Sequence, residues 1–251
     1  MVTEEVTTDH QRVDVGPNQP LAGILEPVGD APTADTTLSD KSRILHYCRT
    51  ESDSPAAINF GFDDIIHLWK EPSMLTYNFD KDFPQYEREF AAGIFAKAVE
   101  EWGKAGIEVR FERVPDDGPA VFQFVYRPSN GGNRKLARAF FPGDRKEARQ
   151  LRVYELAFSN GCRPRMFNIF CHELGHILGL RHEFAPEQEE NQRCATWGER
   201  NTLSVMCYFK DLSRLCVQAS DIKELKQFYD YPGEMYHSFR IVRVDPDCLD
   251  V

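Results

Sequence analysis

The sequence lacks both an apolar run long enough to cross a bilayer and a surplus of positive charge. A membrane-spanning helix needs about 20 consecutive apolar residues, and no stretch of this 251-residue chain approaches that length. Acidic residues number 40 and basic residues 30, which gives a formal net charge of −10. Nucleic acids and anionic membranes attract basic surfaces, so neither is expected as the main partner.

The cysteines lack the close CxxC spacing of many metal and redox sites. There are seven, at positions 48, 162, 171, 194, 207, 216 and 248. An odd number without such pairs fits reduced thiols in a cytosolic protein at least as well as a disulfide framework. Two pairings stay open: Cys194 with Cys216, which flank one loop, and Cys48 with Cys248, near opposite ends of the chain.

The N-terminal residues lack a basic n-region and an apolar h-region. No secretory signal is therefore expected, and a cytoplasmic location is favoured over a secreted one. Residues 1–40 are rich in Thr, Asp, Glu, Pro and Gly; they bury too little apolar surface to offset their ordering entropy, which predicts a flexible tail. The rest suits one globular domain, placed at residues 41–231, with a C-terminal extension at 232–251 and a monomeric state.

Hydrophobic periodicity predicts a mixture of strands and helices. Apolar residues recur about every four positions in 87–102, which favours a helix that ends at Gly103. Segments rich in β-branched and aromatic residues predict strands, at 74–79, 107–111, 120–126, 137–141 and 151–158. The strand at 137–141 carries charge and stops at Pro142, which is typical of a sheet edge.

Two further helices are expected in the second half of the chain. Pro164 suits a first helical turn and opens a helix that runs to about Leu178. A last helix is predicted at 220–231, with Ser220 as its N-cap. The final twenty residues are expected to be extended or irregular.

The segment HELGHILGLRH, which starts at His172, predicts a zinc site. His172 and His176 are one helical turn apart, so both imidazoles leave the same face of the helix. Gly179 can take a left-handed conformation and turn the chain, so that His182 approaches from another side. A catalytic zinc usually has three protein ligands and a water, and Glu173 lies where a carboxylate can contact that water.

This pattern resembles the zinc-binding signature of the metzincin metallopeptidases. A second resemblance lies in Ser-Val-Met-Cys-Tyr at 204–208, which is similar to their Met-turn. It implies that Met206 forms an apolar floor under the metal; ordinary core packing is the alternative for this residue. The order of elements over 68–231 also matches. The resemblance implies an α+β fold with a twisted mixed sheet, an edge strand over the cleft, an active-site helix, a Met-turn and a C-terminal helix.

The details resemble two metzincin subfamilies. Glu183 after the third histidine and Tyr208 after the methionine are similar to astacins, and serralysins share the tyrosine. In those families the tyrosine is a fifth zinc ligand that swings away to stabilise the oxyanion, which implies these roles for Tyr208; a wall of the specificity pocket is the alternative. Residues 136–143 (LARAFFPG) and 75–77 resemble matrixins instead. The astacin signature also continues with further His and Arg residues that are absent here.

The function expected is that of a zinc-dependent endopeptidase acting on peptides or proteins. Glu173 would assist the attack of zinc-bound water as general base, and Tyr208 would help to hold the oxyanion. The backbone of Arg138, Ala139 and Phe140 on the edge strand would bind an extended peptide by strand addition, or would be only a covered sheet edge. Two alternatives are a zinc hydrolase specialised for one peptide-like small molecule and a non-catalytic zinc-containing binding protein; the intact Glu173 counts against the second.

Overall fold

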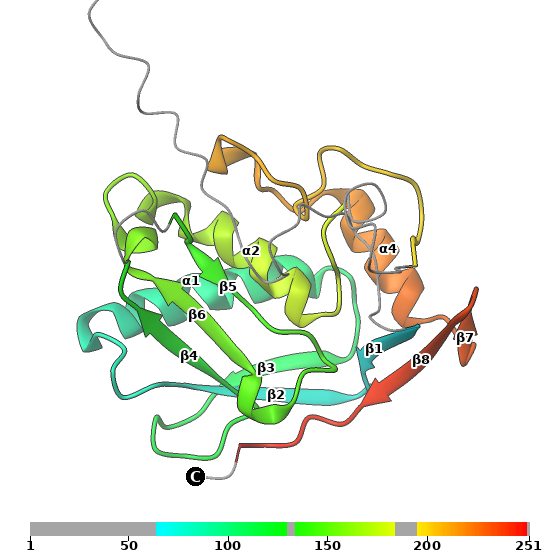
Figure 1. Cartoon of the computed structure of the whole chain (residues 1–251), viewed down its shortest axis with the longest axis horizontal. Helices are drawn as coiled ribbons and strands as arrows, with labels where there is room; N and C mark the ends of the chain where they lie inside the picture. Colours follow the sequence, from blue (N-terminus) through cyan, green and yellow to red (C-terminus); the bar gives the residue numbers. More distant parts are fainter. Residues whose placement is uncertain (1–63, 130–133, 184–194, 250–251) are drawn as a thin grey trace, which may run out of the picture. The chain divides into compact units, whose positions relative to one another are not determined.

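The computed structural model describes residues 64–129, 134–183 and 195–249, which Figure 1 traces in colour. The predicted tail at 1–40 lies outside these ranges. Cys216 and Cys248 carry free thiols. Their possible disulfide partners, Cys194 and Cys48, lie outside the described residues. Among the described residues, no helix combines the length and the apolar content needed to cross a membrane.

A five-stranded mixed sheet forms the frame of the domain, with strand order β3-β2-β4-β6-β5. Its strands are β2 (Ser73–Phe79), β3 (Val109–Arg113), β4 (Phe122–Arg127), β5 (Ala137–Arg138) and β6 (Gln150–Tyr154). The pairs β2–β3, β2–β4 and β4–β6 are parallel, and β5 pairs with β6 in the antiparallel direction. The α+β fold and the mixed sheet predicted from the sequence are therefore confirmed.

The strands differ in length from the predicted ones. The expected edge strand at 137–141 pairs only over two residues. The expected strand at 151–158 is wrong beyond Tyr154, because the next four residues form the 3₁₀ turn η2 (Glu155–Phe158). Phe158 is packed there against the rings of Phe83 and Tyr126, with centroids 6.0 and 6.1 Å away. The apolar pattern at 155–158 therefore indicates that the segment packs on the core, but it does not indicate the backbone conformation.

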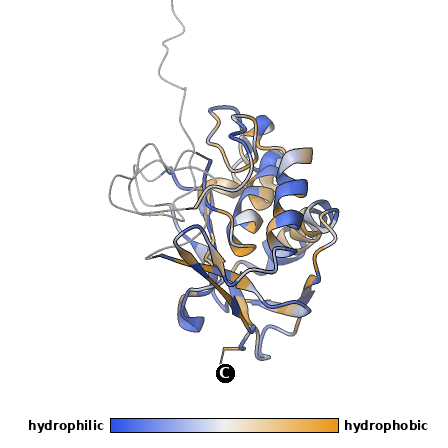
Figure 2. Cartoon of the chain, turned by 90° about the vertical axis from the view of Figure 1, so that its right-hand side faces the viewer, coloured by the Kyte–Doolittle hydropathy of each residue, from blue (hydrophilic) through white to orange (hydrophobic). Residues whose placement is uncertain are grey.

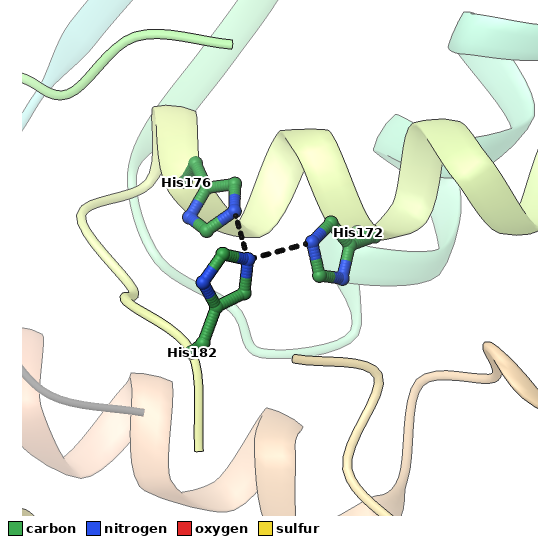
Figure 3. Close-up of side chains that lie close together, drawn as sticks. All are labelled: His172, His176 and His182. Carbon is green, nitrogen blue, oxygen red and sulfur yellow. Dashed lines mark hydrogen bonds between the residues drawn. The ribbon is translucent and has the colours of Figure 1, made fainter. Parts of the chain in front are cut away.

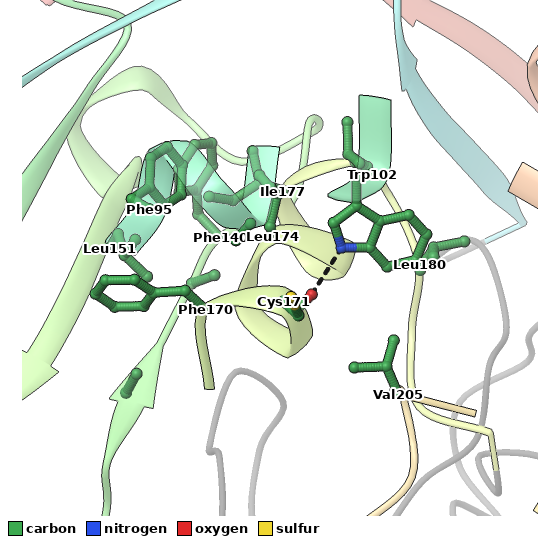
Figure 4. Packing of buried hydrophobic residues seen from close by; sticks show 14 of the residues in the cluster. Phe95, Trp102, Phe140, Leu151, Phe170, Cys171, Leu174, Ile177, Leu180 and Val205 are labelled. Carbon is green, nitrogen blue, oxygen red and sulfur yellow. Dashed lines mark hydrogen bonds between the residues drawn. The ribbon is translucent and has the colours of Figure 1, made fainter. Parts of the chain in front are cut away.

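Two helices pack on one face of this sheet. These are α1 (Gln85–Gly103) and α2 (Met166–Ile177), close to the predicted ranges; Pro164 lies in a 3₁₀ turn just before α2. The Phe95 ring of α1 lies 5.1 Å from Phe124 of β4 and 6.0 Å from Phe170 of α2. Figure 4 shows this core, where the Trp102 indole donates to the Cys171 carbonyl at 2.8 Å. Hydrophilic and hydrophobic residues alternate along many of the helices and strands, as Figure 2 shows.

A second, three-stranded sheet has the order β1-β8-β7. It contains β1 (Ile65–Trp69), β7 (Met235–Tyr236) and β8 (Phe239–Val244). β1 and β8 run side by side in Figure 1 and pair in parallel from Ile65↔Arg240 to Trp69↔Val244. Residues in the predicted C-terminal extension thus form a strand in register with the first described one; the domain boundaries at 40 and 231 stay predictions.

Aromatic side chains from outside the main sheet hold the end of α2. The last carbonyls of a helix have no partner within it. Here the Trp69 indole donates to Ile177 O at 2.7 Å, and the Tyr229 hydroxyl donates to Leu178 O at 3.0 Å. Tyr229 belongs to α4 (Ala219–Tyr229), the predicted last helix, whose N-cap is Gln218 and not Ser220 as expected. The turn that follows α2 is therefore anchored on two sides.

Packing between α2 and the segment at Met206 yields a stability prediction. A Cβ at Gly175 would lie 2.4 Å from the Met206 sulfur and 3.3 Å from Cζ2 of Trp102. We expect Gly175→Ala to lower the free energy of unfolding by about 1–3 kcal/mol, as overpacked cores do, in chemical denaturation. Gly93→Ala on α1 is the control, because no atom lies within 4 Å of its Cβ; it should raise stability by about 0.5–1 kcal/mol. Equal stabilities of the two variants would contradict this packing.

Candidate metal centre and active site

Three histidines converge at the end of α2. Nε2 of His182 lies 3.1 Å from Nε2 of His172 and 3.1 Å from Nε2 of His176, as Figure 3 shows. All three side chains are buried, and their ligand atoms are close enough together to hold one metal ion. The structure thus brings together the three histidines that the sequence pattern singled out.

Gly179 sets the direction from which the third histidine arrives. α2 ends at Ile177, and Gly179 has a φ of +100°, in the region that side chains with a Cβ rarely adopt. A Cβ at this position would also lie 3.2 Å from His67 O and 3.4 Å from Cδ2 of Leu68 on β1. The turn therefore needs glycine for its conformation and for its close approach to β1.

Backbone carbonyls define the protonation of two of the rings. Nδ1 of His172 lies 2.7 Å from Val205 O, and Nδ1 of His176 lies 2.8 Å from Leu180 O. A carbonyl oxygen only accepts, so each Nδ1 carries the proton and donates. Each Nε2 then presents a lone pair toward the convergence point, which is the state a metal ligand requires. Three converging imidazole nitrogens are a ligand set typical of a catalytic Zn²⁺ site.

The segment at 204–208, which resembles a Met-turn in sequence, packs against α2 through Met206. Met206 is fully buried, with its sulfur against Gly175. Its carbonyl accepts a hydrogen bond from the backbone N–H of Glu183 at 3.2 Å. Glu183, the residue after the third histidine, is therefore hydrogen-bonded to Met206. This backbone contact joins the segment that carries His182 to the segment at 204–208.

A chain of hydrogen bonds reaches from the C-terminal helix to His172. The Asp221 carboxylate accepts from Ser204 and from the Val205 N–H at 3.1 Å. Ser204 Oγ accepts from the Met206 N–H at 3.1 Å, and the carbonyl of that same peptide group, Val205 O, accepts from His172. We name these groups the Asp221 relay. Polarisation along such a chain strengthens each bond, so the relay orients His172 and raises its basicity.

Sequence reasoning missed Asp221 and Ser204. Burial raises the pKa of Asp221, and the hydrogen bonds from Gln218, Ser204 and Val205 oppose that rise. The only signal in the sequence is a carboxylate three residues after Gln218, which together form the capping box of α4. The sequence singles out Glu183 only by its position after the third histidine. Burial raises the pKa of Glu183 to about 7, and the hydrogen bond from the Asn201 N–H opposes this rise.

Glu173 lies between the active-site helix and the edge strand. Its side chain is 1% exposed, and Oε2 accepts from the backbone N–H of Ala139 at 2.8 Å. An N–H donor stabilises the charged carboxylate and fixes where it points. The structure therefore places a carboxylate beside the histidine cluster and against the strand expected to bind substrate.

The remaining predicted site residues include Tyr208, Arg138 and Phe140, and each of them has different neighbours. The Tyr208 hydroxyl is 3.5 Å from Nδ1 of His182, and the two ring centroids are 4.5 Å apart; it stands beside this ligand and on the side away from its Nε2. Arg138 is half-buried on β5. Phe140 is 1% exposed and packs on Phe122, 5.3 Å away. Any contact of Phe140 with a peptide would therefore come from its backbone.

The Asp221 relay predicts an effect on zinc affinity. Asp221→Asn removes the negative charge at the end of the relay and replaces one of its two acceptor oxygens by an N–H donor, so we expect zinc to bind about 10–100-fold more weakly, as for other residues that support metal ligands. Competition with a chromophoric chelator measures this. Asp230→Asn is the control, because Asp230 is exposed at the other end of α4 and pairs with Lys226. Unchanged zinc affinity in a folded Asp221→Asn protein would refute the relay.

Comparison with known families agrees with this geometry. Residues 68–189 match the model of the matrixin family, and no curated protein sequence matches the chain. The matched segment contains the five-stranded sheet, both helices on it and the three histidines, and it ends before Met206. It agrees with the matrixin-like features at 136–143 and 75–77 rather than with the astacin-like ones. Residues 68–189, with the zinc-binding pattern that they contain, are therefore similar to the matrixin family of metallopeptidases.

Proposed function

We propose that this chain is a zinc-dependent metalloendopeptidase that cleaves peptide bonds in extended segments of peptides or proteins. The observation that carries the proposal is the position of Glu173, buried beside the three histidines and hydrogen-bonded to Ala139. A binding protein needs only the histidines for zinc. A buried carboxylate that is costly unless it is paired is better explained by a task in catalysis.

Glu173 serves as general base and then as general acid. Zinc, when held by His172, His176 and His182, supplies Lewis acidity, which lowers the pKa of water and polarises a carbonyl. Glu173 takes the proton of the attacking water and delivers it to the leaving amine. The Ala139 N–H donates to the carboxylate and fixes its direction before substrate arrives, so little reorganisation is needed in the reaction.

The outer edge of β5, on which no other strand of the described residues pairs, is the proposed binding site of the substrate backbone. β5 is the last strand of the sheet, and Ala139 directly after it contacts Glu173. A peptide added at this edge would form main-chain hydrogen bonds and pass beside the catalytic carboxylate. Strand addition thus explains how an extended segment, rather than a folded one, reaches the site.

Tyr208 is proposed as a hydrogen-bond donor to the oxyanion. Its hydroxyl lies beside Nδ1 of His182, so a rotation of the side chain is required to reach the side of the ring where the Nε2 atoms meet. The same rotation would be needed for a role as fifth zinc ligand. This role was suggested by astacins and serralysins, whereas the matched family model ends before Tyr208.

Incubation of the full chain with a diverse peptide pool, with and without a zinc chelator, tests the function. We expect cleavage of many peptides that stops when zinc is removed and returns when zinc is added. Cleavage that resists the chelator would contradict zinc catalysis. Absence of any cleavage by zinc-loaded protein would contradict the peptidase and leave a single small-molecule substrate or a binding role.

Glu173→Gln should lower kcat/KM by about 10²–10⁴-fold, the contribution of a general base, with the zinc content unchanged. The amide keeps the shape of the side chain and loses its ability to take a proton. Peptide hydrolysis and metal analysis on the same samples measure the two effects. Glu147→Gln is the control, since Glu147 lies exposed on the 3₁₀ turn η1 (Lys146–Ala148). Substantial turnover by Glu173→Gln would refute the mechanism.

Tyr208→Phe separates its two possible roles. If the hydroxyl stabilises the oxyanion, kcat should fall by about 10²–10³-fold and zinc affinity should stay within twofold of the unmodified chain. Hydrolysis kinetics and chelator competition report these quantities. A fall in zinc affinity would instead indicate a ligand, and unchanged values of both would leave Tyr208 in the wall of the site. Tyr86→Phe is the control, because Tyr86 is 81% exposed.

A further inference from the structure

The sheet face opposite to α1 and α2 carries an arginine cluster, which we define as Arg127, Arg138 and Arg152. Side chains alternate between faces along a strand. Ala137 and Val153 are fully buried on the helix-covered face, so the half-buried Arg138 and Arg152 project from the other one. The cluster therefore belongs to β4, β6 and the edge strand β5, on the side away from the core.

The positive charges of this cluster are close together. Arg138 and Arg152 are directly opposite in the β5–β6 pairing, and like charges in such pairs destabilise a sheet. Arg127 lies on β4, the neighbour of β6 on its other side. Burial lowers the pKa of Arg152, and the charges of Arg138 and Arg127 lower it further. This repulsion is a cost that an anion would remove.

The cluster has no internal counter-charge within the described ranges. Arg152 donates to the Gln150 side chain at 2.9 Å, and Arg127 donates to the Tyr126 carbonyl at 3.2 Å. Neither these two nor Arg138 forms an ion pair with a carboxylate of the described residues, where other arginines such as Arg88 and Arg163 do. Within the described residues these three neighbouring guanidinium groups therefore have no carboxylate partner, which leaves them able to bind the carboxylate of a ligand.

The edge geometry places one substrate side chain beside Arg138. The Tyr154 N–H donates to Leu136 O, so residues 136 and 138 direct their backbone groups toward β6. Residues 137 and 139 then direct theirs to the free edge, as the Ala139 N–H bonded to Glu173 shows. On an added strand, the residue beside Arg138 projects onto the face of the arginine cluster, with Cβ atoms roughly 4.5–5.5 Å apart.

We propose that the arginine cluster is a specificity subsite for acidic side chains, which selects peptides carrying Asp or Glu at the position beside Arg138. The inference rests on the proposed peptidase function and narrows its substrate class. Guanidinium groups bind carboxylates through two parallel hydrogen bonds, so Arg138 and Arg152 together form a fork for one carboxylate. Neutralising the cluster also relieves its internal repulsion.

Substrate profiling tests the subsite. Starting from a peptide that the zinc-loaded chain cleaves, Glu, Gln and Lys are placed in turn at each position around the scissile bond. We expect Glu to exceed Gln by about 10-fold in kcat/KM at one position, equivalent to about 1.4 kcal/mol, and Lys to be disfavoured there. Arg138→Gln should reduce the Glu-to-Gln ratio to about one. Arg145→Gln, at an exposed position, should leave the ratio unchanged.

A binding measurement keeps the subsite testable without hydrolysis. Fluorescein-labelled decapeptides of alternating Glu and Ala, or of Gln and Ala, are titrated with the full chain and anisotropy is followed. We expect the acidic peptide to bind about 10-fold more tightly at 50 mM salt, with the difference shrinking at 300 mM as screening increases. It should vanish in the Arg138→Gln Arg152→Gln double variant.

The outcomes separate the two proposals. Equal binding of the two decapeptides, or a Glu preference that survives the double variant, overturns the acidic subsite. Cleavage of peptides without any acidic preference overturns the subsite and leaves the peptidase intact. Acidic preference in binding without cleavage supports the subsite while the peptidase proposal fails.

Discussion

Two hydrogen bonds between imidazole rings and backbone carbonyls underlie everything else in the site. Val205 O and Leu180 O each accept a hydrogen bond from an Nδ1–H group, which leaves the lone pair of the opposite nitrogen of each ring available to a metal ion. Two different parts of the fold fix the positions of these two carbonyl groups. Gly179 positions one, because the turn it permits brings Leu180 under His176. The Asp221 relay positions the other, through a helix that is remote in sequence.

The parts of the site that could be predicted from the sequence are those encoded over a single helical turn or one tight bend. His172, His176, Gly179 and His182 lie within eleven residues, so helix geometry and the freedom of glycine suffice to bring them together. Val205 O lies 33 residues from His172, and Asp221 lies further still. Neither contact follows from local periodicity, because it depends on how the loop at 204–208 meets α4.

In the fold, too, the features that are local in sequence could be predicted and the contacts between remote segments could not. The helices over 85–103 and 166–177 were predictable from apolar spacing, and β2 from its β-branched and aromatic residues. Tertiary packing overrode the strand pattern at 155–158, where burying Phe158 required a turn. The pairing of β1 with β8 was not predictable, since the two strands are separated by almost the whole described chain, and a parallel pairing leaves no turn signal between them.

The β1–β8 pairing also bears on the order in which the active site can be completed. β1 carries Trp69, which holds the end of α2, and His67 and Leu68, against which the Gly179 turn packs. β8 is the only strand paired with β1 among the described residues, and the two strands are more than 160 residues apart in the sequence, from Trp69 to Phe239. Contacts of such long sequence separation form late because loop-closure entropy must first be overcome. During folding, the helical turn that carries His172 and His176 would thus form before the Gly179 turn gains its full support from β1, so the approach of His182 depends on one of the latest contacts of the fold.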